Sequence, residues 1–238
     1  IYVAPDSSVA TNVTGMTNVL QAARLLKTKK IIATSTSEIY GTAQYAPIDE
    51  VHPVNPQSPY AATKSAADQM AISYHRSFDL PVVVLRPFNT FGPRQSARAV
   101  IPTIISQMLL GQSQIKLGNL NATRDLNFVD NTVDAFLKVA TCDKGYGEVF
   151  NTGSGVEVSI GEVVEIIAKI LKVKVKIKQD PARLRPKKSE VERLVCNYDK
   201  LNAHCGWTPK VSLEEGLKIT CAWMKNNINH YKTDIYNV

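Results

Sequence analysis

The apolar positions of the first 90 residues follow two spacings in turn, one typical of helices and one of buried strands. Apolar residues three and four apart predict helices over 7–27 and 59–78. Continuous apolar runs predict buried strands over 29–36 and 81–87, and the prolines of 41–57 indicate a loop. This alternation predicts an α/β fold with a parallel sheet and right-handed crossovers.

The same two spacings continue with shorter elements to the end of the chain. Helices are predicted near 97–110, 131–141, 159–171, 199–204 and 212–227, and strands over 114–117, around Leu126 and Phe128, and over 148–152 and 173–178. With 238 residues, of which 44% are hydrophobic, the chain can bury a large core and has room for two lobes.

The chain carries a formal net charge of +7, which raises nucleic-acid binding as a hypothesis. The lysines of 172–178 alternate with apolar residues, which predicts a strand with one solvated lysine face that protects an exposed sheet edge. Aromatic residues do not interleave with these charges, as they would in a protein that binds single strands. We therefore expect no nucleic-acid partner.

The four cysteines, Cys142, Cys196, Cys205 and Cys221, show no C-x-x-C spacing. They are typical of reduced thiols in a cytosolic protein rather than of a zinc site or a disulfide framework, so no metal is expected. No apolar run reaches the length of a membrane span, and no signal peptide is visible. The sequence thus predicts a cytoplasmic protein without a membrane partner.

Tyr60 and Lys64 lie four residues apart, which places a phenol and an ammonium on one face of the predicted helix 59–78. An adjacent ammonium is expected to lower the pKa of the phenol, so that Tyr60 exchanges a proton with a substrate hydroxyl near neutral pH. The hydroxyl of Thr36, at the end of the predicted strand 29–36, is placed to hold the same substrate oxygen.

A tyrosine and a lysine at this spacing are usually no more than an exposed pair on a helix. Here the pair follows a strand that ends in the small hydroxyl residues Thr34 to Ser37 and in Glu38. In open α/β sheets the ligand crevice lies beyond the carboxyl ends of the strands. Two independent features therefore converge on one site and favour the catalytic interpretation.

Four segments carry a family resemblance, and they occur in the order 35–41, 58–64, 86–94 and 124–130. Together they resemble the extended short-chain dehydrogenase/reductases that act on nucleotide sugars. The resemblance runs from about residue 6 to about residue 227 and is more specific for the superfamily than for the reaction. It implies a Rossmann-like doubly wound parallel sheet and a small C-terminal α/β substrate lobe.

The resemblance also implies how the chain is divided. Residues 1–90 and 123–152 match the NAD(P)-binding domain, and 91–122 and 153–238 match the substrate lobe. Members of the family open with a glycine-rich turn that holds the dinucleotide pyrophosphate, but no G-x-x-G-x-x-G occurs here and Gly153-Ser154-Gly155 is better explained as a turn. We therefore expect an N-terminally truncated chain that lacks the first βαβαβ half.

The cofactor implied by the resemblance is NAD, tightly bound and recycled within one turnover, with NADP less favoured. The residues that match its contacts are Thr34, Tyr60, Lys64, Pro87 and Phe88. The basic composition is then explained by an anionic nucleotide sugar rather than by nucleic acid.

Residues that match the family's substrate contacts are Asn89, Arg94, Arg124, Arg185 and Glu190. A planar guanidinium suits a diphosphate, which favours Arg124 for that task, whereas Arg94 and Arg185 are weaker candidates. The structural alternatives are a turn cap at Asn89 and a surface ion pair between Arg124 and Asp125.

The reaction depends on Ser37 and Glu38. The family's 4,6-dehydratases oxidise the sugar at C4, eliminate water across C5 and C6, and return the hydride to C6, and Glu38 matches the base at C5. The glucose-type dehydratases have an aspartate at the position of Ser37. The hydroxyl here resembles GDP-mannose 4,6-dehydratase and the UDP-N-acetylglucosamine 4,6-dehydratase of the legionaminic-acid pathway. A plain turn carboxylate is the alternative for Glu38.

Other functions stay open at this point. A 4-epimerase and a UDP-glucuronate decarboxylase, which also carries a Thr-Ser-Glu run, are the enzymatic alternatives. A non-catalytic fragment that cannot bind NAD is the alternative of another class. Helices 7–27 and 59–78 resemble the pair through which family members dimerise, so we expect a homodimer, while the sequence leaves UDP and GDP sugars equally open.

Overall fold

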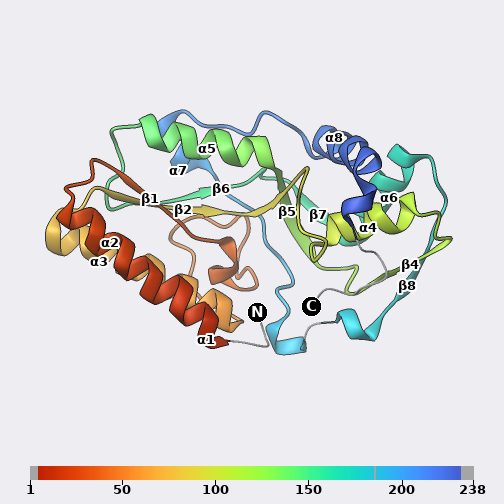
Figure 1. Cartoon of the computed structure of the whole chain (residues 1–238), viewed down its shortest axis with the longest axis horizontal. Helices are drawn as coiled ribbons and strands as arrows, with labels where there is room; N and C mark the ends of the chain where they lie inside the picture. The colour runs from red at the N-terminus through yellow and green to blue at the C-terminus, as the bar shows by residue number, and fades with distance from the viewer. Residues whose placement is uncertain (1–4, 185, 232–238) are drawn as a thin grey trace.

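The computed structural model describes residues 5–184 and 186–231, and these form three layers around a central parallel sheet (Figure 1). The sheet has the strand order β1–β2–β6, with β1 at Ile31–Thr34, β2 at Val82–Pro87 and β6 at Val149–Thr152. Both pairings are parallel, as the apolar runs predict. The carboxyl ends of all three strands therefore meet at one edge of the sheet.

Helices cover both faces of this sheet. On one face, α2 (Gly15–Leu25) and α3 (Pro59–Phe78) lie side by side and bury Leu20 and Ala71 against β1 and β2. On the other face, α5 (Val129–Thr141) and α7 (Asp199–Cys205) pack on β2 and β6 around the fully buried Trp207. The expected α/β fold class is thus confirmed.

The predicted helix over 7–27 is real but not continuous. It begins as α1 (Pro5–Ser8), widens into a π-helix, η1 (Val9–Thr14), and continues as α2. At the junction, Gly15 N donates a hydrogen bond to Ala10 O, five residues back. π-Turns of this kind often occur at functional sites, and this one faces α3.

The remaining elements build a second core beside the central sheet (Figure 1). Strand β5 (Thr123–Phe128) pairs parallel with β3 (Asn89–Phe91) and antiparallel with β7 (Glu157–Ser159). Strand β4 (Gln114–Leu117) pairs with β8 (Lys176–Gln179). Helices α4 (Val100–Leu109), α6 (Ile160–Leu171) and α8 (Leu213–Asn226) enclose the core, and short 3₁₀ turns lie at Ser37–Tyr40 (η2), Pro181–Arg183 (η3), Lys187–Ser189 (η4) and Ile228–His230 (η5).

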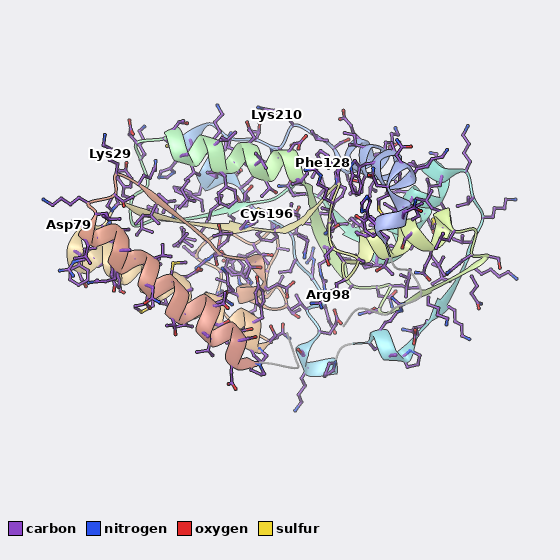
Figure 2. The ribbon with its side chains drawn as sticks, viewed as in Figure 1. Lys29, Asp79, Arg98, Phe128, Cys196 and Lys210 are labelled. Carbon is purple, nitrogen blue, oxygen red and sulfur yellow. The ribbon has the colours of Figure 1, made fainter. Side chains whose placement is uncertain are left out.

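Phe128 lies where the two cores meet (Figure 2). Its ring packs edge-on against Phe91, with the ring centroids 5.7 Å apart, and both side chains belong to the second core. The division into a cofactor domain and a substrate lobe stays a prediction, because β5 shares its sheet with β3 and β7 rather than with β6.

Most predicted elements have the expected type with ends shifted by a few residues. Strands β3 and β7 were not predicted, because each has three residues, too few to show the alternation of apolar and polar residues in a strand. The predicted strand 173–178 is observed as β8 at Lys176–Gln179, and all four of its residues are exposed. Among the described residues, no helix is both long enough and apolar enough to cross a membrane.

Asp125 anchors the turn that follows β6. Its carboxylate is fully buried and accepts four hydrogen bonds, from Ser154 N and Oγ at 2.7 Å each, from Gly155 N at 2.8 Å and from Cys196 N at 3.1 Å. Gly155 has φ +73°, a left-handed conformation that glycine adopts without strain. The lone Gly153-Ser154-Gly155 run is therefore a turn built on a carboxylate, as its isolated position predicts.

We expect Asp125→Asn to lower the free energy of unfolding by about 2–4 kcal/mol, because an amide group would face buried N–H donors. Urea denaturation followed by circular dichroism measures this change. Asp143→Asn is the matched control at an exposed position and should stay within about 0.5 kcal/mol of the parent. Equal stability of the two variants would contradict the anchoring role.

Candidate active site

Three successive residues at the end of β1 contact three residues of α3 that are spaced four apart. Lys64 Nζ donates a hydrogen bond to Thr34 O, Ser35 Oγ donates to Asp68 Oδ2 at 2.8 Å, and the Thr36 hydroxyl donates to the Tyr60 phenol. We call these three pairs the β1–α3 contacts. They bring the predicted strand end and the predicted helix face into contact.

The local sequence explains why α3 starts where it does. Ser58 caps the helix, because its Oγ accepts a hydrogen bond from Ala61 N at 3.1 Å, and Pro59 occupies the first turn, where no N–H is needed. With this start, Tyr60 is in the first turn, and Lys64 and Asp68 follow on the same face at intervals of four residues.

Ser37 and Glu38 open the 3₁₀ turn η2 directly after β1. Thr36 caps this turn by accepting a hydrogen bond from Glu38 N at 3.3 Å. Gly41 ends it with φ +66°, and a Cβ there would come within 2.3 Å of Asn55 O, so the tight return of the chain requires glycine. Glu38 is half-buried, whereas Ser37 is 1% exposed.

The electrostatics of Tyr60 differ from the prediction. Burial raises the pKa of Tyr60, the nearby Glu38 carboxylate raises it further, and the hydrogen bond from Thr36 lowers it. The expected lowering of this pKa by Lys64 was wrong, because burial and Glu38 outweigh the opposing effect of Thr36. The Lys64 ammonium donates its hydrogen bond to the carbonyl of Thr34 rather than to the phenol. Burial lowers the pKa of Lys64 itself, and Asp68 raises it.

A buried polar network continues from Asp68 into the sheet. Arg86, on β2, donates to Asp68 Oδ2 at 3.0 Å and to the Tyr40 phenol at 2.8 Å. The phenol in turn donates to Asn151 Oδ1 at 2.8 Å, on β6. Burial raises the pKa of Tyr40 to about 12, so this phenol stays protonated at physiological pH. The network links α3, η2 and all three strands beneath the site.

The junction of β2 and β3 supplies the next candidates. Phe88 is buried, and its N–H donates to Thr152 O at 2.8 Å, which holds Pro87 and Phe88 at the carboxyl edge of the sheet. Among the described residues, the buried Oδ1 of Asn89 and the buried Oγ1 of Thr152 have no hydrogen-bond partner. A buried acceptor without a partner suits a donor group of a bound ligand.

Arg124 and Glu190, both predicted to contact the substrate, contact each other. Arg124 Nη2 lies 3.2 Å from Glu190 Oε1, and the side chains are only 11% and 16% exposed. The alternative pairing of Arg124 with Asp125 was wrong, because Asp125 binds the 153–155 turn instead. Arg185 lies outside the described residues.

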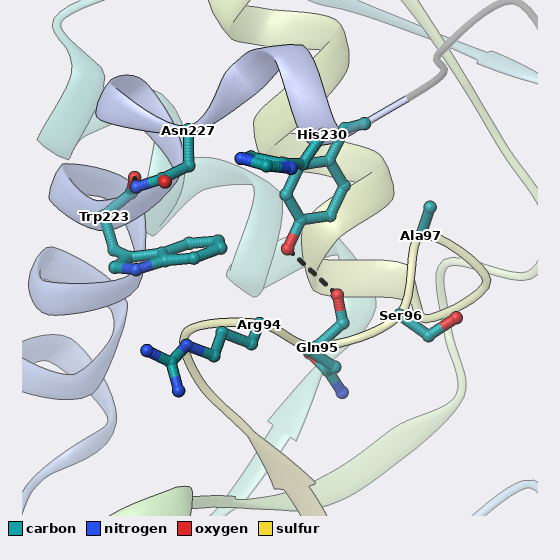
Figure 3. A pocket seen from close by; sticks show the side chains of 8 residues that line it. Arg94, Gln95, Ser96, Ala97, Trp223, Asn227 and His230 are labelled. Carbon is teal, nitrogen blue, oxygen red and sulfur yellow. Dashed lines mark hydrogen bonds between the residues drawn. The ribbon is translucent and has the colours of Figure 1, made fainter.

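Arg94 lies at a pocket that contains none of the residues of the β1–α3 contacts. It is exposed, has φ +67°, and lines a pocket with residues of α8 and η5, including Trp223, Asn227 and His230 (Figure 3). Tyr231 closes one side of this pocket by donating to Gln95 O at 3.0 Å. Neither Asn89 nor Arg124 lines this pocket. Asn89 instead pairs with Leu126 on β5, the strand that carries Arg124.

Several residues whose hydrogen bonds hold the site in place were not predicted from the sequence. These are Ser35, Asp68, Arg86 and Tyr40, together with Asn12 of the π-turn, whose Nδ2 donates to Thr63 Oγ1 at 3.0 Å. Asp68 had a usable signal, because it continues the spacing of Tyr60 and Lys64 by one further helical turn. Asn12 and Arg86 carry no such pattern.

The site fits the nicotinamide end of a dinucleotide better than it fits a metal. Within the described ranges, no cluster of three or more His, Cys, Asp or Glu side chains could hold a metal ion. The ammonium of Lys64, the phenol of Tyr60 and the unpartnered acceptor of Asn89 are instead donors and acceptors suited to ribose and sugar hydroxyls.

Comparison with known sequences places this site in a family. A sequence model of the GDP-mannose 4,6 dehydratase family matches residues 2–220. The UDP-glucose 4-epimerase of Mycolicibacterium smegmatis is 35% identical over 226 residues, which cover 93% of this chain and 71% of that protein. The human dTDP-D-glucose 4,6-dehydratase is 31% identical, and the match covers 93% of this chain and 63% of that protein.

Solved structures agree with this placement. The dTDP-glucose 4,6-dehydratase of Bacillus anthracis in complex with NAD superposes with a TM-score of 0.87 at 30% identity, covering 94% of this chain and 70% of the other. RMD from Pseudomonas aeruginosa with NADPH gives 0.87 at 27% identity, covering 95% and 77%. UDP-glucuronic acid 4-epimerase from Bacillus cereus with UDP-glucuronic acid and NAD gives 0.85 at 28% identity, covering 92% and 68%.

The fold and the site define a Rossmann-type short-chain dehydrogenase/reductase of the extended class. More narrowly, the chain belongs to the GDP-mannose 4,6-dehydratase family, whose members found here include nucleotide-sugar 4,6-dehydratases and 4-epimerases.

The opposing effects of Glu38 and Thr36 on Tyr60 predict opposite changes on mutation. Glu38→Gln should lower the pKa of Tyr60, because it removes a nearby negative charge, and Thr36→Val should raise it, because it removes a donor to the phenolate. Carbon-13 NMR of labelled tyrosines measures both, with Tyr60→Phe identifying the signal. Shifts in the same direction would contradict this account of the site.

Proposed function

We propose that the protein is an NAD-dependent nucleotide-sugar 4,6-dehydratase. One observation carries the proposal: the half-buried Glu38 carboxylate lies close enough to the Tyr60 phenol to shift its pKa, at the carboxyl end of β1. Two proton-handling groups close together suit a reaction that moves protons at two neighbouring positions, O4 and C5.

We assign Tyr60 the role of the base that removes the proton of the C4 hydroxyl. Thr36 donates to the phenol and thereby stabilises its deprotonated form. The base role requires the pKa of Tyr60 to fall from its raised value, and Lys64, one turn along the same helix face, is the cation placed to supply the change. A bound nicotinamide dinucleotide supplies the reversible hydride acceptor for the sugar carbons.

We assign Glu38 the role of the base that removes the proton at C5. A ketone at C4 acidifies that proton, so the Glu38 carboxylate can remove it. The protonated Glu38 can then pass this proton to the C6 hydroxyl, which leaves as water. Ser37 neighbours this base but is buried, so we assign it a supporting rather than a proton-donating role. The turn η2 presents Glu38 rigidly because Thr36 caps it and Gly41 ends it.

The substrate-facing assignments follow the geometry of the candidates. Asn89 offers its unpartnered Oδ1 to a sugar or nucleotide hydroxyl, and Arg124 offers its guanidinium to the diphosphate, which then competes with Glu190 for the same cation. Arg94 is assigned a peripheral contact, because its pocket excludes the other two. The role of Arg185 rests on the motif alone.

The cofactor contacts follow the sheet edge. Lys64 and Tyr60 are assigned to the ribose, and the backbone of Thr34, Pro87 and Phe88 to the nicotinamide side of the pocket. NAD is preferred because NAD accompanies the Bacillus anthracis dehydratase and the Bacillus cereus epimerase, although NADPH accompanies RMD.

A 4-epimerase is the second candidate. It is favoured by the 35% identity to the Mycolicibacterium smegmatis epimerase and by the absence of an aspartate at position 37. An epimerase needs Tyr60 and Thr36 but has no proton to remove at C5. The role of Glu38 therefore separates the two candidates.

The full-length protein, incubated with NAD and UDP-N-acetylglucosamine or GDP-mannose, should give a product lighter by one water in mass spectrometry. Glu38→Gln should reduce that product at least about 100-fold while NAD binding persists, because the loss of a general base typically has this scale. Asp49→Asn, at a carboxylate outside the site, should keep the activity.

Other outcomes decide between the alternatives. An isomer of unchanged mass would contradict dehydration and favour epimerisation. Loss of carbon dioxide from UDP-glucuronate would favour the decarboxylase. No turnover on any of these substrates would favour the non-catalytic interpretation.

We also propose a homodimer through the outer faces of α2 and α3. Val19, Leu25 and Phe78 are 57%, 71% and 47% exposed on this pair of helices, which is unusual for large apolar side chains along a helix surface. Helix pairs that expose such a face commonly pack against a second copy.

Light scattering should give twice the chain mass for the parent protein and the single mass for Val19→Glu, because a buried unpaired charge opposes association. Val51→Glu, which changes a valine that is 84% exposed in a loop, should remain dimeric. A monomeric parent protein would refute the dimer.

A further inference from the structure

Asp68 is the member of the β1–α3 contacts to which the proposed reaction gives no task. Its side chain is 3% exposed, and Oδ2 accepts hydrogen bonds from both Ser35 Oγ and Arg86 Nε. A carboxylate buried to this extent is unfavourable unless it is paired and hydrogen-bonded. Arg86 and Ser35 meet that requirement for Asp68, and the carboxylate lies in the site, on the same helix as Lys64.

Asp68 lies one helical turn from Lys64 on the same face of α3. Burial lowers the pKa of Lys64, and Asp68 is the group that raises it. Burial raises the pKa of Asp68 above its usual value. Arg86 from β2 opposes this shift most strongly, and the Ser35 hydroxyl and Lys64 of the same helix also lower the pKa. The Tyr40 phenol of η2 reaches it only through Arg86.

The contacts also fix the end of β1. Ser35 lies between Thr34, whose carbonyl accepts from Lys64, and Thr36, whose hydroxyl donates to Tyr60. The backbone of Ser35 is held in turn, because its N–H donates to Leu85 O at 2.8 Å. A bond from Ser35 to a rigid carboxylate therefore restricts the orientation of both neighbouring groups.

We propose that Asp68, held by Ser35 and Arg86, is a positioning residue for the proton-handling pair. It keeps Lys64 protonated, and through Ser35 it sets the carbonyl and hydroxyl that contact Lys64 and Tyr60. The inference rests on the proposed function, because Tyr60 and Lys64 are the pair that this function uses.

The pH dependence of Lys64 acetylation in the chain without cofactor tests this inference. Peptide mass spectrometry resolves Lys64 from the other lysines. In Asp68→Asn, half-maximal acetylation should move to lower pH, so that modification at a fixed pH near neutrality rises several-fold, because the neutral amine reacts and its counterion is gone. Ser35→Ala should give a smaller shift in the same direction.

Asp125→Asn is the matched control, because it makes the same change at another fully buried carboxylate. It should lower stability and leave the Lys64 profile unchanged. An unshifted profile in Asp68→Asn, or an equal shift in Asp125→Asn, would overturn the inference. If Asp68→Asn does not fold, Ser35→Ala decides, and an unshifted profile there would overturn it too.

This measurement is independent of turnover. A full-length protein that releases no water from nucleotide sugars, while Lys64 shifts as expected, would refute the dehydratase proposal and leave the positioning role of Asp68 standing. Release of water together with an unshifted Lys64 profile would support the dehydratase proposal and refute the positioning role of Asp68.

Discussion

The buried ion pair between Asp68 and Arg86 is the interaction on which the position of the site depends. It joins α3 to β2, and both side chains are almost fully buried, with 3% of Asp68 and 4% of Arg86 exposed. Such a pair is stable only when its remaining polar atoms are bonded, and Ser35 and Tyr40 provide those bonds. The strand end that carries Thr34 and Thr36 is thereby tied to the helix that carries Lys64 and Tyr60.

Part of this arrangement could be predicted from the sequence. The periods of apolar residues gave the main helices and strands, and the i, i+4 spacing of Tyr60 and Lys64 beside a strand ending in hydroxyl residues gave the location of the site. Local patterns suffice for both, because helix faces and buried strands leave a period in the chain.

The rest depends on contacts between distant segments. Ser35 and Asp68 are 33 residues apart, and Arg124 and Glu190 are 66 apart, so no local pattern announces either pair. The pKa of Tyr60 was mispredicted for the same reason: spacing places Lys64 on the correct face but does not reveal that the carbonyl of Thr34 takes its ammonium. Short strands such as β3 and the π-turn at 9–14 depend on packing that no single segment encodes.

The relatives of this chain include both dehydratases and epimerases, so family membership alone does not select between the two reactions. The acid–base groups around the sugar, rather than the fold, select the outcome, which makes the removal of a proton at C5 the central claim. The direct measurement is NMR of the product formed by the full-length protein in D2O. Removal of the C5 proton by Glu38 should introduce solvent deuterium at C5, and a product that keeps the substrate's own hydrogen at C5 would contradict this role.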